Sequence, residues 1–170
     1  ASPTENHLFE FKPPASDYQI INGADFFNTA PAKFSTGLSV KYVPADLPHE
    51  YFISLESTEV LIMRSGFVDP YYKNITVDII DSTWKLRNPL PLGFTDLSKL
   101  KVHLIKKSKQ RMWVKGLNIK STSIPVGQAS RYVYCMYMNA VDFIDCSIDQ
   151  SDFKNHGSMI ALTRCLDVTG

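Results

Sequence analysis

The chain has 170 residues, of which 44% are hydrophobic and 21% are charged, and its formal net charge at pH 7 is +1. This length suits one globular domain with its own core, and the composition excludes a disordered chain. A charge so close to zero excludes a bulk electrostatic attraction to nucleic acid or to a membrane surface. No apolar run reaches the roughly 18 residues that a membrane-spanning helix needs.

The N-terminal stretch, residues 1–17, holds three prolines around an alternating apolar patch and is predicted to be an extended arm. From residue 18 onward, short segments rich in Val, Ile, Tyr and Phe alternate with Pro, Gly, Asn and Asp, which is typical of strands. Two single helical turns are expected at 24–29 and 97–100, and no internal repeat is visible. The predicted strands are 18–21, 37–43, 51–55, 60–63, 75–80, 101–106, 112–120, 132–138, 141–148 and 159–165.

Regular short strands with turn residues between them predict an all-β fold with little helix, a β-sandwich or a jelly-roll barrel. Residues 18–170 are expected to form this single domain behind the arm.

A tight turn is predicted at residues 66–74, which read GFVDPYYKN, between two apolar runs. Glycine, Asp-Pro and a following Asn are the residues that such turns favour. The turn would bring Asp69 and Tyr72 close together. As a purely structural alternative, Asp69 would accept backbone hydrogen bonds within its own turn.

This stretch resembles the third motif of dUTP pyrophosphatases. Residues 34–44 and 97–105 are similar to neighbouring strands of that family, so the resemblance covers about residues 20 to 106. It is strongest to the first domain of the herpesvirus enzymes and to the herpesvirus dUTPase-related proteins, which have lost activity. The resemblance implies a dUTPase-like sandwich, with Asp69 in the place of the general base and Tyr72 in the place of the sugar-stacking tyrosine.

The phosphate-binding parts of that family are missing. Arg64, Ser65 and Gly66 are the only candidate for the phosphate loop and lead directly into the turn, whereas the family places that loop about a strand earlier. A phosphate cradle needs several glycines, but residues 131–170 contain only Gly157 and Gly170. We therefore expect no enzymatic activity and no cofactor, with Asp69 and Tyr72 as vestigial catalytic candidates.

The long loop at 82–99 is the candidate partner-binding segment, because long loops in compact domains are commonly functional. Its large apolar side chains would be anchors for a protein partner. The alternative is a lid that covers one end of the sandwich. These side chains are Trp84, Leu90, Leu92 and Phe94.

The only dense basic run lies between two predicted strands. Three interpretations stay open: a solvated hairpin tip, a nuclear-import signal, and a phosphate-contacting patch with Trp113 beside it. Its cations are Lys106, Lys107, Lys109 and Arg111.

Cysteine and histidine give no sign of a metal site or a disulfide framework. Cys135, Cys146 and Cys165 form no Cys-x-x-Cys pair, and the four histidines are scattered. Free, buried thiols in a reducing compartment are the expected state. Asn74 begins a glycosylation sequon that matters only if the chain is secreted.

The leading functional hypothesis is a non-catalytic viral dUTPase-related protein that binds host or viral regulators and interferes with host gene expression or innate signalling. One alternative is a dUTP pyrophosphatase whose active sites are completed between subunits. The other is a structural or secreted β-sandwich binding protein, such as a capsid-type jelly roll. A protein partner is expected, with no membrane or nucleic-acid binding. The expected location is the host nucleus or cytoplasm, or outside the cell if a signal peptide has been removed.

Overall fold

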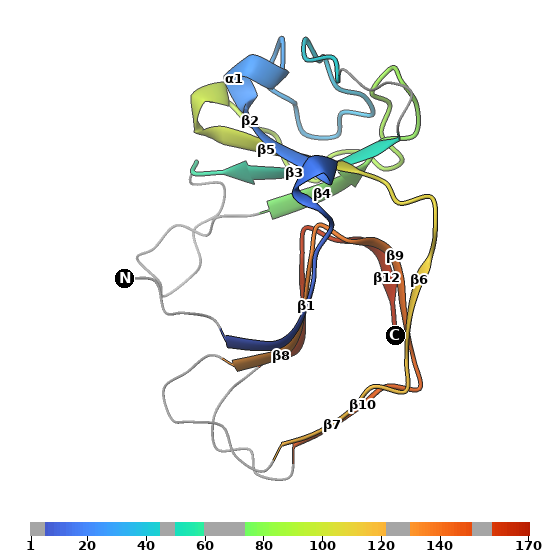
Figure 1. Cartoon of the computed structure of the whole chain (residues 1–170). Coiled ribbons are helices and arrows are strands. Elements are labelled where there is room, and N and C mark those ends of the chain that lie inside the picture. Colours follow the sequence, from blue (N-terminus) through green and yellow to red (C-terminus); the bar gives the residue numbers. More distant parts are fainter. Residues whose placement is uncertain (1–5, 45–49, 60–73, 122–129, 151–157) are drawn as a thin grey trace. The chain divides into compact units, whose positions relative to one another are not determined.

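The computed structural model of the protein (Figure 1) describes residues 6–44, 50–59, 74–121, 130–150 and 158–170. They form two compact units. The antiparallel unit is Pro14–Lys107, and the parallel unit combines Ala1–Pro13 with Ser108–Gly170. This grouping differs from the predicted arm of residues 1–17 followed by one domain over 18–170. The all-β prediction is confirmed: strands dominate, α1 (Gly23–Phe26) spans four residues, and the described strands form several sheets and no closed barrel.

The antiparallel unit is built on one four-stranded sheet. Its order is β2 (Tyr18–Asn22), β5 (Leu100–Lys106), β3 (Tyr51–Ser57) and β4 (Asn74–Asp78), and every neighbouring pair is antiparallel. Two 3₁₀ turns, η1 (Ala15–Asp17) and η2 (Leu97–Lys99), complete the unit with α1.

Most sequence predictions in the antiparallel unit are confirmed. The four strands lie where alternation placed them, and α1 and η2 lie at the two expected helical turns. The predicted strand 37–43 is reduced to isolated bridges at Gly37 and Val40. The predicted strand 60–63 lies outside the described residues.

The core of this unit lies on one face of its sheet. Alternate residues of β3, β4 and β5 point into it, for example Ile53, Val77 and Val102, which are at most 5% exposed. Phe26 and Phe27 pack edge to face with ring centres 4.8 Å apart. Gly23 allows α1 to lie close to η2, because a Cβ atom there would stand 2.7 Å from the Leu97 carbonyl oxygen.

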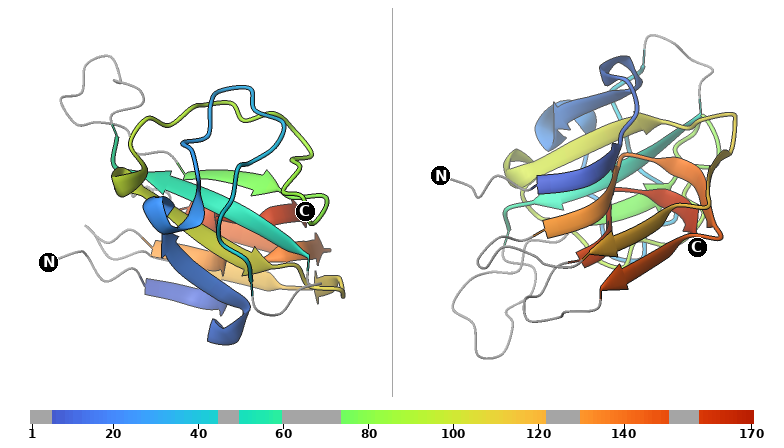
Figure 2. Two further views of the ribbon diagram at one scale, coloured as in Figure 1. Left: turned by 90° about the horizontal axis from the view of Figure 1, so that it is seen from above. Right: turned by 60° about the horizontal axis from the view of Figure 1, so that its bottom comes forward.

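The parallel unit consists of three small sheets in which every neighbouring pair is parallel (Figures 1 and 2). Sheet I contains β1 (Asn6–Phe11), β8 (Ser130–Met136) and β11 (Ser158–Thr163). Sheet II contains β6 (Met112–Lys115), β9 (Asn139–Ile144) and β12 (Leu166–Thr169). Sheet III contains β7 (Asn118–Ser121) and β10 (Ser147–Gln150).

The chain winds through these sheets as a coil. Strands β6, β7 and β8 lie in sheets II, III and I, and β9, β10 and β11 repeat that order before β12 returns to sheet II. Val133 lies opposite Ile160, 27 positions later, and Met112 lies opposite Val141, 29 positions later. The expectation of no internal repeat is therefore wrong. A stack of short parallel strands is the arrangement of a β-solenoid.

The corners of the coil recur with the same backbone geometry. Tyr137 and Arg164 both have φ near +60°, at 60° and 54°, and they occupy the same corner one turn apart. The corner between sheets II and III has Gly116 at φ 66° and then Asp145 at 52°. Left-handed backbone lets the chain turn sharply between strands. These corners divide the predicted strands 112–120 and 141–148 into two strands each.

The interior of the coil is apolar. Val133, Cys135 and Val141 are at most 1% exposed, and Phe11 and Phe143 pack against them, with their two rings edge to face at 6.2 Å. All three cysteines are free; Cys135 is buried, and Cys146 and Cys165 are half-buried. Within the described residues, no helix is long and apolar enough to cross a membrane.

Candidate binding surface

The vestigial catalytic pair cannot be placed. Asp69 and Tyr72, like the rest of 60–73, lie outside the described residues, and the structure has no bearing on their roles.

The apolar residues of the 82–99 loop belong to the core of the antiparallel unit. Leu90 and Phe94 are 0% and 4% exposed. Trp84 and Leu92 are half-buried against the same cluster, and the Trp84 ring meets the Phe26 ring edge to face at 5.2 Å. Leu90 and Phe94 therefore present no surface to a partner, while Trp84 and Leu92 keep part of theirs exposed.

The loop is held by backbone hydrogen bonds to residues 31–36. Phe34 N–H donates to the Leu90 carbonyl at 2.8 Å, and Leu90 N–H donates to the Ser35 carbonyl at 3.0 Å. Gly93 makes this approach possible, because a Cβ atom there would lie 2.7 Å from the Lys33 nitrogen. Phe34 itself has φ +65° and is 69% exposed.

The basic run is divided between the two units, because Lys107 ends one and Ser108 begins the other. Lys107 forms an ion pair with Asp78, and its ammonium donates to the Ile79 carbonyl at 2.9 Å. Arg87 contacts the other Asp78 oxygen at 2.5 Å. Burial alone would raise the pKa of Asp78, but the bonds from Arg87 and Lys107 outweigh it and hold the pKa below 3.8. Lys107 is therefore a structural cation, while Lys109 is exposed.

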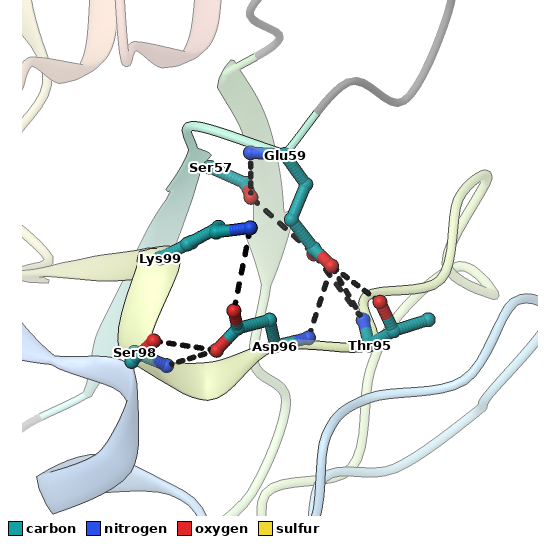
Figure 3. Close-up of polar contacts among 6 residues, drawn as sticks. All are labelled: Ser57, Glu59, Thr95, Asp96, Ser98 and Lys99. Atoms are coloured by element: carbon teal, nitrogen blue, oxygen red, sulfur yellow. Dashed lines mark hydrogen bonds and ion pairs between the residues drawn. The ribbon is translucent and has the colours of Figure 1, made fainter.

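Glu59 is the centre of a polar cluster at the end of β3 (Figure 3). Its carboxylate accepts from the Asp96 N–H at 3.0 Å, from the Thr95 N–H and hydroxyl, and from the Ser57 hydroxyl at 3.4 Å. Asp96 in turn caps η2 by accepting from the Ser98 N–H at 2.9 Å. A carboxylate with this many donors joins two segments of the chain. We interpret the cluster as a structural clip.

A distinctive exposed surface lies on the outer side of sheet II. Trp113, Asp142 and Thr169 occupy one register row across β6, β9 and β12. Trp113 is 61% exposed, while its neighbour Val114 packs into the coil, so the indole projects outward. The Lys115 ammonium lies 5.3 Å from the centre of the indole ring. We call Arg111, Trp113, Asp142, Asp167 and Thr169 the Trp113 surface.

Arg111 connects successive turns of the coil on this surface. Its two terminal nitrogens lie 2.5 Å from Asp142 and from Asp167. Asp142 also accepts from the Thr169 hydroxyl. The hydrogen bond from Thr169, and after it the Arg111 guanidinium, lowers the pKa of Asp142 below 3.8. Arg111 is thus paired with two carboxylates and Lys107 with one, so two of the four cations of the basic run are engaged within the protein.

Chemically, the Trp113 surface combines a wide aromatic face with ordered polar groups around it. Such a surface can stack on the flat apolar side of a ligand while donating and accepting hydrogen bonds at its edge. Sequence reasoning noticed Trp113 beside the basic run but missed Asp142, Asp167 and Thr169. They meet only through the parallel register, and the repeat of 27 to 29 residues was the signal that could have joined them. Among the described residues, no group of three His, Cys, Asp or Glu side chains could hold a metal ion.

Comparison of the sequence with protein-family models and with curated proteins finds no match. Comparison of the fold with solved structures does find similar proteins. Two phage tailspikes share this fold. The tailspike protein gp49 of Pseudomonas phage LKA1 is similar with a TM-score of 0.58 and 12% identity over 88% of this chain. The tailspike gp61 of Pseudomonas phage phi297 is similar with a TM-score of 0.59 and 14% identity over 96% of this chain. The chain spans about a quarter of each, namely 23% and 27% of their lengths.

These neighbours overturn the resemblance to the herpesvirus dUTPase-related family, which is wrong. The resemblance depended on one nine-residue turn and two strand-like stretches within residues 20 to 106. A Gly-x-x-Asp-Pro pattern followed by Tyr is favoured by many tight turns between antiparallel strands, whatever the protein family. Such a pattern is therefore no evidence of common ancestry.

Proposed function

We propose that this chain is a structural and binding part of a viral, tailspike-like β protein. The observation that supports this most is the parallel coil with its antiparallel unit, an arrangement shared with two phage tailspikes over 88% and 96% of the chain. Of the functions left open by the sequence, the structural or secreted β binding protein fits this fold. No observation favours the host-regulator hypothesis.

The Trp113 surface is the ligand-binding part of the proposal. A stack of short strands holds outward side chains on a rigid lattice, which lowers the entropic cost of binding. Arg111 fixes two of the surrounding carboxylates across neighbouring turns. The exposed indole can then contribute aromatic contact area at a site that is already organised.

Three expectations from the sequence stay predictions. They are that the chain is not an enzyme, that its partner is a protein rather than nucleic acid or membrane, and that it lies in the host nucleus or cytoplasm. A tailspike-like role would place the partner on the surface of a bacterial cell, which makes the second and third testable together.

The test uses the complete chain with a fluorescent label at its N-terminus. The labelled protein is mixed with intact cells from a panel of Pseudomonas strains, and the pelleted fraction is measured against protein concentration. We expect saturable binding to at least one strain. Loss of binding after protease treatment of the cells would indicate a protein ligand, and loss after periodate oxidation would indicate a carbohydrate.

Two variants locate the site. Trp113→Ala should weaken cell binding about tenfold, which corresponds to about 1.4 kcal/mol. Ile20→Ala removes another exposed apolar side chain, 56% exposed, from the antiparallel unit and should leave binding unchanged. Binding to no strain would contradict the binding function. Equal binding by wild type and Trp113→Ala would exclude the Trp113 surface as the binding site without contradicting the binding function.

A further inference from the structure

One corner of the coil is longer than the equivalent corners of the later turns by about a hundred residues. In the second turn, residues 136–140 connect Cys135 in sheet I to Val141 in sheet II, and in the third turn residues 163–167 connect Leu162 to Val168. In the first turn, Phe11 occupies the register position of Cys135, and Met112 occupies that of Val141. Residues 12–111 therefore stand where the later turns have five residues.

We infer that the antiparallel unit is a module inserted into a continuous coil, and that the corner between sheets I and II is a permissive insertion site. The coil keeps its register on both sides of the insertion. Residues 6, 7 and 9–11 of β1 pair with β8, and residues 112–115 of β6 pair with β9, as though the corner between them were short. This inference rests on strand register and is independent of the ligand proposed above.

The inserted unit has the closed form that an insertion requires. Its first and last strands are direct neighbours: Tyr18, at the start of β2, lies opposite Ile105, one residue before the end of β5. Antiparallel neighbours of this kind have Cα atoms about 5 Å apart, so the chain enters and leaves the unit at almost the same point. The unit also buries its own apolar cluster around Phe26 and Leu90. A domain with adjacent ends and its own core is the kind that insertion tolerates best.

The later corners show how the coil closes without an insertion. Tyr137 N–H donates to the Thr163 carbonyl at 3.1 Å, and Leu166 N–H donates to the Met138 carbonyl at 2.9 Å. Each bond links one turn to the next on either side of the corner. The strands before and after the corner are thus fixed independently of the chain between them. This explains why the corner accepts additional residues.

The coil and the inserted unit therefore have separate roles. The coil, carrying the Trp113 surface, is a scaffold whose register is set by sheets I to III. The antiparallel unit is an addition that can vary in sequence and size without changing that register. Its exposed Phe34, at φ +65° and 69% exposed, belongs to the module rather than to the scaffold.

The test places a new insertion at equivalent corners of the complete chain. A twelve-residue Gly-Ser loop is inserted between Tyr137 and Met138 in the second turn or, separately, between Arg164 and Cys165 in the third. Hydrogen exchange followed by mass spectrometry then reports protection of β8, β9 and β11. We expect protection to persist in at least one corner variant, with a fall in Tm of less than about 10 °C, because closing a loop of this length costs little.

The control is the same loop inserted between Val133 and Tyr134, inside β8. It should abolish protection in β8 and β11, because it disrupts the parallel register on both sides of β8. Persistent protection in a corner variant together with its loss in the strand variant supports the inference. If both corner insertions remove protection of β11 as completely as the strand insertion, the corner is not permissive and the inference is overturned.

Discussion

The two units of this molecule are both all-β, yet they pair their strands and bury their apolar side chains in different ways. The antiparallel unit pairs strands that are distant in sequence and fills one face of its sheet with Phe, Leu, Ile and Val. The parallel unit pairs each strand with the one a turn later and stacks apolar residues of several sizes inside a coil. The antiparallel unit depends on one continuous apolar core, and the parallel unit depends on a repeated register. Their responses to substitution should therefore differ.

The largest expected effect is in the core of the antiparallel unit. Leu90→Ala should lower the free energy of unfolding by about 3 kcal/mol, since it removes a fully buried side chain and leaves a cavity. Urea denaturation of the complete chain measures the change. Leu92→Ala, at a half-buried position in the same loop, is the matched control and should cost less. A Leu90→Ala variant as stable as wild type would restore the partner-anchor hypothesis for this loop.

The next effect concerns the ion pairs that Asp78 makes with Arg87 and Lys107. Asp78→Asn should cost about 1–3 kcal/mol at pH 7, because it leaves the nearly buried Lys107 without its counter-charge. The pKa of Asp78 is lowered below 3.8 in the folded state, so its contribution is present above about pH 4 and is lost as the pH falls through the lowered value.

Measured from pH 5 to pH 2, the free energy of unfolding should therefore fall more steeply for wild type than for Asp78→Asn. Identical pH dependence of the two proteins would show that Asp78 is not held by these cations in solution.

How far the sequence could be read also differs between the units. In the antiparallel unit, strands of five to seven residues between Pro, Gly and Asp turns gave clear alternation, and β2, β3, β4 and β5 were all predicted. In the parallel unit, the corners carry Tyr137, Ala140, Asp145, Arg164 and Asp167 at positive φ. Turn prediction relies on Gly and Pro, so these corners gave no signal.

The binding surface was harder to predict than the fold for the same reason. Trp113, Asp142 and Thr169 are far apart in sequence and become neighbours only when β6, β9 and β12 are placed in register. The tight-turn motif at 66–74, by contrast, was easy to see and misleading, because local turn chemistry is shared by unrelated proteins. In this chain, periodicity between segments carried more information than any single motif.

A smaller effect is expected at the corners of the coil. Asp145 has φ 52°, a conformation that costs a residue with a Cβ atom more than it costs glycine. Asp145→Gly should raise the free energy of unfolding by about 0.5–1 kcal/mol. The mirror variant is Gly116→Ala, at φ +66° in the same corner one turn earlier, where a Cβ atom would meet nothing within 4 Å. It should cost about 1 kcal/mol from the backbone alone. Changes of the same sign in both variants would contradict the shared corner geometry.

The smallest expected effect is measured by chemical labelling of the cysteines, which reports on one of the two units without any substitution. All three cysteines lie at or beyond position 135, so thiol labelling reports on the parallel unit alone. Burial, and after it the neighbouring Cys165 thiol, raises the pKa of Cys135 to about 12, and burial also raises the pKa of Cys165. At pH 8 the folded chain should therefore leave Cys135 unlabelled by a thiol-specific disulfide reagent, because the thiolate is the reactive form.

In urea, the labelling of Cys135 should rise with the loss of hydrogen-exchange protection in β8 and β11. Rapid labelling of Cys135 in the native protein would mean that the coil opens readily, and that its repeated register stabilises it less than the large apolar core stabilises the antiparallel unit.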